Sequence, residues 1–386
     1  MPAIDLGAAR DGPGTHALVV GVSHYRHLSG PEASPFGEQF GLEDLTSAAR
    51  SASEVVAWLL NEYHNPAAPL ASLRVALSPA DGESYADGVA GRLPRSHAAT
   101  RDAVEKDVIA FRRDCEHPEN VAFVYVAGHG IQLTNRGAIV LLEDFADPDR
   151  ADLYGAVDMM GCHAGLYGTG YANSQFWFVD ACRQRPRVAS KFENLQGGVL
   201  DLKGPPGEVE CAPVYLASAS RDLAFAEVGG LTLFSQVLLS ALRGAAAVGP
   251  EEDRGIGWHV SAQKLGRVLK EGVAELAKAK SEDQSVQPVG WPGEAVIQHF
   301  EDPPSVRVVL TLEPSGAADR TSVSMLFDAD EDQKVIDDVA EWPLERTLPA
   351  GLYQIRVKTK QPVTEVKLKP STVYPPKYER VIEVAE

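Results

Sequence analysis

The stretch Ser174–Pro186, SQFWFVDACRQRP, decides the fold. Its four consecutive apolar residues, Phe176 to Val179, predict a strand that is buried on both faces, as in parallel sheets covered by helices. Asp180-Ala181-Cys182-Arg183 follows at once. Ligands of such sheets bind beyond the carboxyl ends of the strands. Cys182 therefore stands where a catalytic residue is expected.

A second predicted strand ends in the same way. Val121–Ala127 (VAFVYVA) leads into Gly128-His129-Gly130. The glycines allow a sharp turn and a close approach to a ligand, which leaves the His129 imidazole at the edge of the sheet. A thiol and an imidazole at one edge predict nucleophilic acyl transfer, in which the base helps to form the thiolate and then protonates the leaving amine. His24, which follows the first predicted strand, is the competing imidazole.

The two motifs, AGHG and VDACR, resemble those of the caspase-like cysteine peptidases, which include caspases, metacaspases and their prokaryotic relatives. Asp180 stands where caspases carry Gln, and Gln184 where they carry Gly, so the Asp-x-Cys form is most similar to metacaspases and bacterial orthocaspases. The resemblance implies that Cys182 is the nucleophile and His129 the general base. It also implies an oxyanion hole formed by the backbone N–H groups of Gly130 and Cys182.

Asp180 bears on the substrate class. In the Asp-x-Cys relatives this carboxylate lines the primary specificity (P1) pocket, and the resemblance implies that it binds a substrate Arg or Lys. A partly buried carboxylate gains from a bidentate guanidinium and disfavours an acidic side chain. Metacaspases usually carry a second acid, and the matching stretch SAARSASEVV has Ser51 there. The candidates for the missing charge are Asp44, Asp222 and Glu227; the alternative is that Asp180 only caps its loop.

The segment after the nucleophile, residues 183–212, is basic and has no clear periodicity. In caspase relatives the corresponding segment is cut during maturation. The resemblance therefore implies a zymogen that cuts itself or is cut by an upstream activating protease. The alternative is a solvated basic loop. The candidate cleavage residues are Arg183, Arg185, Arg187, Lys191 and Lys203.

Strands and helices alternate as far as residue 300, which predicts an α/β fold with a doubly wound, mostly parallel six-stranded sheet and helices on both faces. This order resembles the caspase catalytic domain. The expected strands are His16–Val22, Leu73–Leu77, Val121–Ala127, Phe176–Val179, Pro213–Ala217 and Ala295–Phe300, with Ala138–Leu142 as a further short strand. The expected helices are Leu45–Leu60, one capped by Thr100, Asp152–Leu166, Leu231–Leu242 and Val260–Ala277.

From Pro303 the pattern changes to β-branched runs broken by turn residues, such as Val306–Leu312 and Thr321–Phe327. It predicts a separate β-sandwich of six or seven short strands, in which Leu348–Val357 (LPAGLYQIRV) is the last hairpin. We therefore expect a catalytic domain of residues 1–302 and a C-terminal β-sandwich domain of residues 303–386.

The composition narrows the functional classes. A net charge of −18 over 386 residues disfavours nucleic acid and suits basic peptide substrates. Neither a membrane-spanning apolar run nor a secretory signal is expected. Four cysteines without CxxC spacing favour a reducing cytoplasm over disulfides or a zinc site. We expect no cofactor or membrane partner, structural roles for Cys115, Cys162 and Cys211, and a surface position for His163. Calcium activation, seen in some metacaspases, stays open.

These observations favour a cytoplasmic cysteine endopeptidase that cleaves proteins after Arg or Lys. The resemblance to caspase-like proteins further implies a place in a bacterial defence or cell-suicide pathway. One alternative is a protease of the clostripain or CHAT kind with narrower specificity. The other is a catalytically silent caspase homologue that acts as a scaffold. Intact GHG and DAC motifs disfavour the scaffold, because a scaffold needs neither residue.

Overall fold

The computed structural model describes residues 4, 6, 12–93, 97–131, 138–168, 170–181, 199–200, 209–219, 230–250, 255–290, 292–327, 334–360 and 363–384. They divide into two compact units. One comprises Met1–Leu239 and Leu265–Gln298, and the other Ser240–Lys264 and His299–Glu386. Along the described parts of the chain, no helix combines the length and the apolar character needed to cross a membrane.

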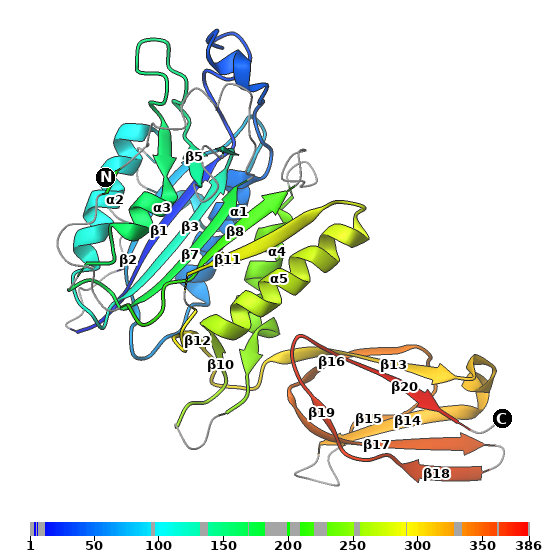
Figure 1. Ribbon diagram of the computed structural model, residues 1–386. Coiled ribbons are helices and arrows are strands. Elements are labelled where there is room, and N and C mark those ends of the chain that lie inside the picture. Colours follow the sequence, from blue (N-terminus) through cyan, green and yellow to red (C-terminus); the bar gives the residue numbers. More distant parts are fainter. Residues whose placement is uncertain are drawn as a thin grey trace. The chain divides into compact units, whose positions relative to one another are not determined.

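A six-stranded sheet in the order β11-β8-β7-β3-β1-β2 forms the centre of the first unit (Figure 1). Its parallel strands are β1 (Thr15–Val22), β2 (Leu70–Ser78), β3 (Val121–Gly128), β7 (Ser174–Ala181) and β8 (Val214–Ala219). The edge strand β11 (Gln284–Val289) runs antiparallel to β8. The mostly parallel six-stranded sheet is thus confirmed.

The sixth strand was expected in the wrong place. The stretch expected to form it, Ala295–Phe300, contains only the short strand β12 (Val296–His299), which is not part of this sheet. The edge strand is instead QSVQPV, in which Gln284 and Val286 are buried and the remaining residues are more exposed. A strand at an edge does not need the continuous apolar run by which the central strands are recognised.

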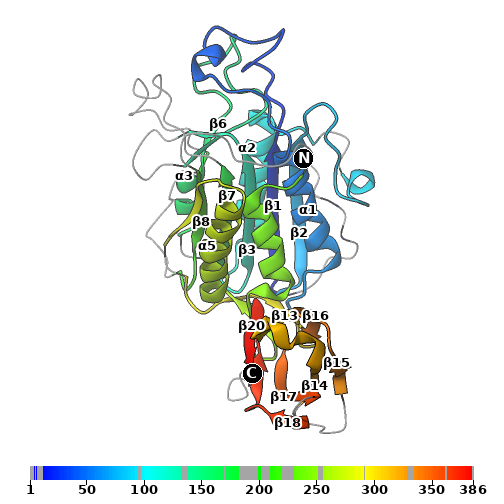
Figure 2. The same ribbon diagram turned by 90° about the vertical axis from the view of Figure 1, so that its right-hand side faces the viewer.

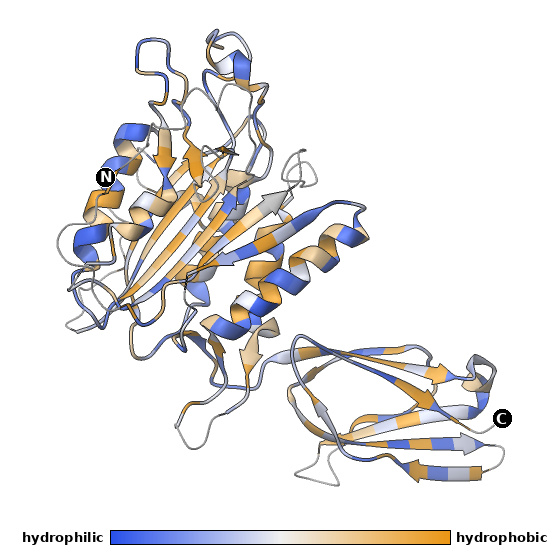
Figure 3. Ribbon diagram, in the orientation of Figure 1, coloured by the Kyte–Doolittle hydropathy of each residue, from blue (hydrophilic) through white to orange (hydrophobic). Residues whose placement is uncertain are grey.

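Helices cover both faces of the sheet (Figures 1 and 2). On one face α1 (Ala48–Asn61) sets Trp58 against Phe123 of β3, with ring centroids 6.1 Å apart. The same face carries α4 (Leu233–Ser240) and α5 (Ala262–Ala279). On the other face α2 (Arg101–Asp114) and α3 (Met159–Ala164) share a core with alternate residues of β3 and β7, such as Val124 and Val179. Figure 3 shows these central strands as mostly hydrophobic, as expected for a doubly wound sheet.

Two helices differ from expectation. Where Asp152–Leu166 was expected to be helical, the strand β6 (Ala156–Asp158) precedes α3 and joins β4 (Gly130–Ile131) and β5 (Ile139–Leu141) in a small antiparallel sheet. Gly155 prevents an earlier start, because it has a φ of +82° and a Cβ there would lie 2.6 Å from the Phe145 backbone. The helix expected over Leu231–Leu242 is split into α4 and a π-helical turn, Ala241–Ala245.

The second unit contains a β-sandwich, as expected. One sheet has the order β16-β13-β20 and the other β15-β14-β17-β18, with β19 also paired to β17. Buried residues of both sheets form one core, among them Val308, Leu310, Met325 and Ile355. The strands are β13 (Ser305–Glu313), β14 (Thr321–Phe327), β15 (Lys334–Val339), β16 (Leu344–Pro349), β17 (Gly351–Lys360), β18 (Val363–Lys367), β19 (Ser371–Val373) and β20 (Lys377–Glu383). The described residues thus hold more than the six or seven strands expected, because β18 is exposed and β19 is very short.

The stretch Leu348–Val357 is not a hairpin. Strand β16 pairs with β13, whereas β17 pairs with β14, so the chain passes from one sheet to the other at Ala350. A single residue between two strands is shorter than the two-residue loops that close hairpins. This unit also contains the short antiparallel pair β9 (Ala247–Val248) and β10 (His259–Ser261).

Candidate active site

The two motif-bearing strands are neighbours in the sheet. Strands β3 and β7 pair in parallel, and their register ends with Gly128 opposite Ala181. These are the residues that directly precede His129 and Cys182 in the chain. Cys182 itself lies outside the described residues, as do the loop candidates Arg183, Arg185, Arg187, Lys191 and Lys203 and the acids Asp222 and Glu227.

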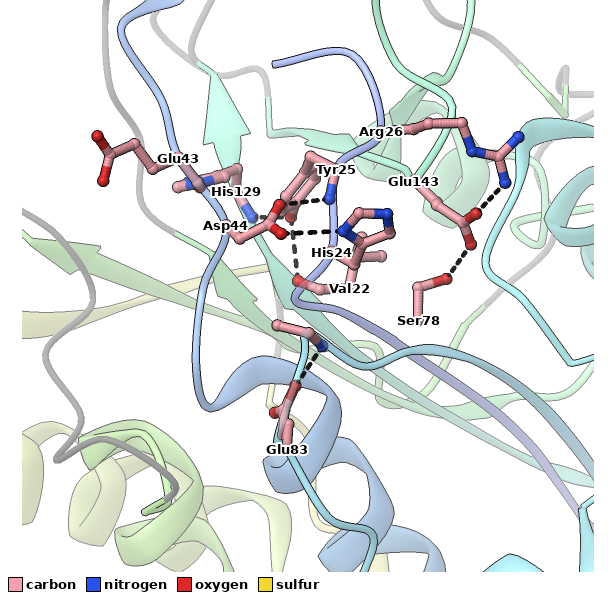
Figure 4. Close-up of polar contacts among 11 residues, drawn as sticks. Val22, His24, Tyr25, Arg26, Glu43, Asp44, Ser78, Glu83, His129 and Glu143 are labelled. Carbon is pink, nitrogen blue, oxygen red and sulfur yellow. Dashed lines mark hydrogen bonds and ion pairs between the residues drawn. The ribbon is translucent and has the colours of Figure 1, made fainter. Parts of the chain in front are cut away.

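The His129 side chain is 3% exposed and has a defined orientation (Figure 4). Its Nε2 lies 2.7 Å from the carbonyl oxygen of Glu43. A carbonyl only accepts hydrogen bonds, so Nε2 carries a proton, and the neutral ring has its lone pair on Nδ1. Burial lowers the pKa of His129, while the Glu43 carbonyl and the Asp44 charge act in the opposite direction.

Tyr25 holds the backbone of the same histidine. Its hydroxyl accepts a hydrogen bond from the His129 N–H at 2.6 Å and donates to the Val22 carbonyl at 3.1 Å. The rings of Tyr25 and His129 pack with centroids 4.8 Å apart. Gly128 makes this contact possible, because a Cβ at that position would lie 2.7 Å from the Tyr25 hydroxyl.

Gly130 lies at the start of β4, opposite Val140 of β5. The Leu141 N–H donates to the His129 carbonyl at 2.9 Å, so this carbonyl points toward β5. The Gly130 N–H belongs to the same peptide group, and in a trans peptide the C=O and N–H point in opposite directions. The Gly130 N–H therefore points away from β5, as the proposed oxyanion-hole donor would have to.

Asp180 is 2% exposed and faces the α1 and α4 side of the sheet. Its Oδ2 accepts hydrogen bonds from the hydroxyls of Tyr125, at 2.8 Å, and Thr232. Its Oδ1 has no hydrogen-bond partner among the described residues. Burial raises the pKa of Asp180 to about 6, and the two hydroxyl donors act against this rise. A buried carboxylate oxygen without a donor is costly, and either a hydrogen-bond donor or a cation would satisfy it.

Comparison with known protein families identifies the family of this chain. A caspase domain model matches residues 15–255 of the chain. The protein belongs to the caspase family. The matched region holds the strands that carry the GHG and DAC motifs, so the resemblance of those motifs is confirmed, and the domain is of the cysteine-peptidase type.

Among curated proteins, the chain is similar to the uncharacterized protein y4kE of Sinorhizobium fredii (strain NBRC 101917 / NGR234). It is 28% identical over 248 residues, which are 63% of this chain. The chain spans 64% of the length of that relative.

Within the caspase domain, Ser51 lies beside Asp180 in a cluster of hydroxyls. The Ser51 hydroxyl accepts hydrogen bonds from the Ser235 hydroxyl at 2.9 Å and from the Thr232 N–H at 3.0 Å. The position at which metacaspases were expected to carry a second acid thus contacts the same Thr232 that binds Asp180. Asp44 lies elsewhere, because its carboxylate bonds to His24 and to the Tyr25 backbone.

The three described cysteines of the caspase domain are buried. Burial raises the pKa of Cys162 and of Cys211 to about 12, and that of Cys115 well above its ordinary value. Thiols with such pKa values stay protonated at neutral pH and are poor nucleophiles. This supports structural roles for the three cysteines.

The expected surface position of His163 is wrong. The side chain is buried, its Nε2 lies 3.1 Å from the Ala212 carbonyl, and its ring packs edge-on against Trp177. Burial lowers its pKa to about 4. The sequence predicts that His163 lies in a helix, and only the packing of α3 against the sheet determines which face of that helix is covered.

Two partners of His129 were missed from the sequence. Tyr25 stands in the family-like stretch VGVSHY, and its place three residues after the end of a buried strand is a signal that could have been used. Glu43 acts through its backbone carbonyl. No residue type marks a carbonyl acceptor of this kind, so no sequence signal could have identified it.

Proposed function

We propose that the protein is a cysteine endopeptidase that cleaves its substrates after Arg or Lys, with Cys182 as nucleophile and His129 as base. The observation that carries this proposal is the register of β3 and β7, which pairs Gly128 with Ala181 next to both residues. Neighbouring strands lie about 4.8 Å apart, which is within reach of a Cys–His dyad. The Nε2 contact with Glu43 leaves Nδ1 to accept the thiol proton.

The reaction follows from these groups. Nδ1 of His129 takes the proton of Cys182, and the thiolate attacks the scissile carbonyl carbon. The oxyanion is stabilised by the backbone N–H groups of Gly130 and Cys182. The C–N bond breaks as the imidazolium returns its proton to the leaving amine, and water then hydrolyses the thioester. The Glu43 carbonyl stabilises the imidazolium, because both ring nitrogens of that cation donate.

Asp180 is the proposed receptor for the basic side chain. An ionised carboxylate buried with a free oxygen is stabilised by a cationic ligand, and a guanidinium satisfies both oxygens at once. An acidic substrate side chain would add a second negative charge to the same pocket. Asp222 and Glu227 remain candidates for further charge at this site.

The burial of Asp180 supports the proposal that the enzyme is made in an inactive form and must be activated. A substrate side chain reaches this carboxylate only after the groups that cover it have moved, and the Thr232 hydroxyl is one of them. We propose a zymogen whose basic segment, residues 183–212, is cut by the enzyme itself or by an upstream protease. Incubation of the wild-type and Cys182→Ala proteins side by side tests this. A fully active wild-type enzyme with an intact segment would contradict it.

The setting of the activity is proposed to be the bacterial cytoplasm, in a defence or cell-suicide pathway. The family relation and the Sinorhizobium relative support a bacterial caspase homologue. Expression of the wild-type chain, but not of the Cys182→Ala variant, is then expected to arrest growth once the enzyme is activated. Equal growth of both strains would count against this role.

Hydrolysis of short fluorogenic peptides ending in Arg, Lys or Asp tests the proposed activity. The enzyme is assayed before and after limited proteolysis, with calcium or with a chelator, and Cys182→Ala is the control. Cleavage after Arg or Lys that is lost in the control is the expected result. Cleavage after Asp would overturn the role of Asp180, and no cleavage under any condition would favour the scaffold.

A further inference from the structure

Two segments that are distant in the sequence run together beside His129 (Figure 4). One is Ser23–Arg26, directly after β1, and the other is Glu43–Leu45, before α1. Asp44 joins them through both carboxylate oxygens. Its Oδ1 accepts the Tyr25 N–H at 2.7 Å, and its Oδ2 lies 2.9 Å from Nδ1 of His24. We call Asp44 with these two partners the Asp44 bridge.

The first segment is held firmly to the rest of the unit. The N–H groups of Ser23 and His24 both donate to the Ser78 carbonyl, at 2.8 and 3.0 Å. The Arg26 N–H donates to the Glu143 carbonyl at 3.0 Å, and the two side chains form an ion pair. The Ser23–Arg26 segment is thus anchored to the rest of the unit, and the Asp44 bridge attaches the second segment to it.

The second segment carries the carbonyl that orients His129. Glu43 directly precedes Asp44, and its carbonyl oxygen lies 2.7 Å from Nε2 of His129. Next to the bridge, the Leu45 N–H donates to the Ser23 carbonyl at 2.8 Å. Tyr25 is a member of the bridge and also holds the His129 N–H. Both ends of His129 therefore depend on residues that Asp44 ties together.

We propose that Asp44, together with His24, is a positioning residue that fixes the Glu43 carbonyl and thereby the orientation of His129. This inference rests on the proposed function, in which His129 is the general base. Asp44 then has a different role from supplying a second negative charge to the P1 pocket, because both of its carboxylate oxygens already bind His24 and the Tyr25 N–H.

The effect is expected on catalysis rather than on stability. The His24 and Asp44 side chains are 45% and 38% exposed, and exposed ion pairs contribute little to folding. A displacement of about 1 Å in a catalytic group, in contrast, can cost about 100-fold in rate.

Steady-state kinetics of Asp44→Ala and Asp44→Asn on Arg and Lys peptides tests the role. We expect kcat to fall by about 10- to 100-fold in Asp44→Ala, with KM nearly unchanged and the melting temperature only slightly lower, because the Tyr25 N–H loses its acceptor. Asp44→Asn should recover part of the loss, because its amide oxygen can still accept the Tyr25 N–H. Glu38→Gln is the matched control: it removes an exposed acid of the same loop whose carboxylate makes no hydrogen bond or ion pair with the described residues.

A second readout does not depend on activity. In a Cys182→Ala background, the Nε2 proton of His129 should give a slowly exchanging signal by nuclear magnetic resonance. Adding Asp44→Ala should accelerate its exchange, whereas adding Glu38→Gln should not. This comparison holds even if no peptidase activity is found, so the two proposals can fail separately.

Three outcomes would overturn the proposal. The first is a rise in KM for basic peptides with kcat unchanged, which would place Asp44 in substrate binding. The second is wild-type kinetics in both Asp44 variants. The third is unchanged exchange of the Nε2 proton in the Asp44→Ala background.

Discussion

His129 and Asp180 extend from neighbouring strands, and both are almost fully buried, yet their surroundings differ in kind. His129 is held by main-chain contacts, with Nε2 on the Glu43 carbonyl, and by the Tyr25 hydroxyl on its own N–H. Asp180 is held by rotatable hydroxyls, those of Tyr125 and Thr232, and one of its oxygens has no partner among the described residues.

The difference indicates two tasks. Backbone contacts cannot rotate away, so they suit a group that must keep one orientation during proton transfer. Hydroxyl donors can turn toward another acceptor, so they suit a carboxylate that exchanges them for a substrate cation. The predictions below test this contrast between a fixed base and an exchangeable receptor.

The largest effect is expected from His129→Ala. Loss of a general base typically lowers the rate by about 100- to 10,000-fold, and all peptides should be affected alike. The measurement is kcat/KM on Arg and Lys substrates, with His117→Ala as the control, because His117 is an exposed histidine after α2. Activity within a few-fold of wild type in His129→Ala would remove this residue from the catalytic role.

A smaller and selective loss is expected from Asp180→Asn. Removing one partner of a buried ion pair costs about 2–5 kcal/mol, which corresponds to roughly a 30- to 1,000-fold lower kcat/KM on basic substrates. The peptide panel should show that this loss is confined to substrates ending in Arg or Lys. Equal losses on uncharged P1 residues would mean that Asp180 supports the fold or the nucleophile instead.

The same substitution should stabilise the fold. In the folded protein burial raises the pKa of Asp180 to about 6, from an ordinary value of 3.8. The folded state therefore binds the proton more tightly, and stability falls as the pH rises from 3.8 to 6. At neutral pH the ionised group costs up to about 3 kcal/mol.

Denaturant unfolding of wild type and Asp180→Asn at pH 4 and pH 7 measures this cost. We expect the variant to be more stable at pH 7 and nearly equal to wild type at pH 4. A variant that is less stable at pH 7 would show that the Asp180 carboxylate is well compensated in the folded state.

The smallest effect is expected from Tyr25→Phe. The change removes the hydroxyl that binds the His129 N–H and the Val22 carbonyl, but keeps the ring that packs on His129. Each lost hydrogen bond costs about 1 kcal/mol, so stability should fall by about 1–2 kcal/mol, with a loss of kcat of about tenfold or less. Thermal unfolding measures the loss of stability, and steady-state kinetics measures the loss of kcat. A large rise in KM would contradict the role of Tyr25 in positioning His129.

The sequence predicted best what depends on short-range patterns. The runs before His129 and Asp180 are apolar at consecutive positions, and this pattern correctly predicted β3 and β7 and their place in a parallel sheet. The strand β11 was missed because an edge strand alternates buried and exposed residues. The hairpin predicted at Leu348–Val357 was wrong because turn residues do not reveal which sheet the next strand joins.

The site was predicted in part for the same reason. Strand-end motifs identified His129 and Asp180, whereas their partners come from distant segments, such as Glu43 and Thr232. These contacts arise only when the chain has folded. The Glu43 contact in particular involves a backbone atom, which any residue type provides.

Labelling with peptidyl chloromethyl ketones tests the central claim most directly, because it reports the nucleophile and the pocket together. The activated enzyme is treated with ketones that present Arg or Asp at P1, and the labelled cysteine is identified by peptide mapping. We predict that only the Arg ketone reacts, that it modifies Cys182 alone, and that His129→Ala or Asp180→Asn slows the reaction. Labelling of Cys115, Cys162 or Cys211, or preferential reaction with the Asp ketone, would contradict the account.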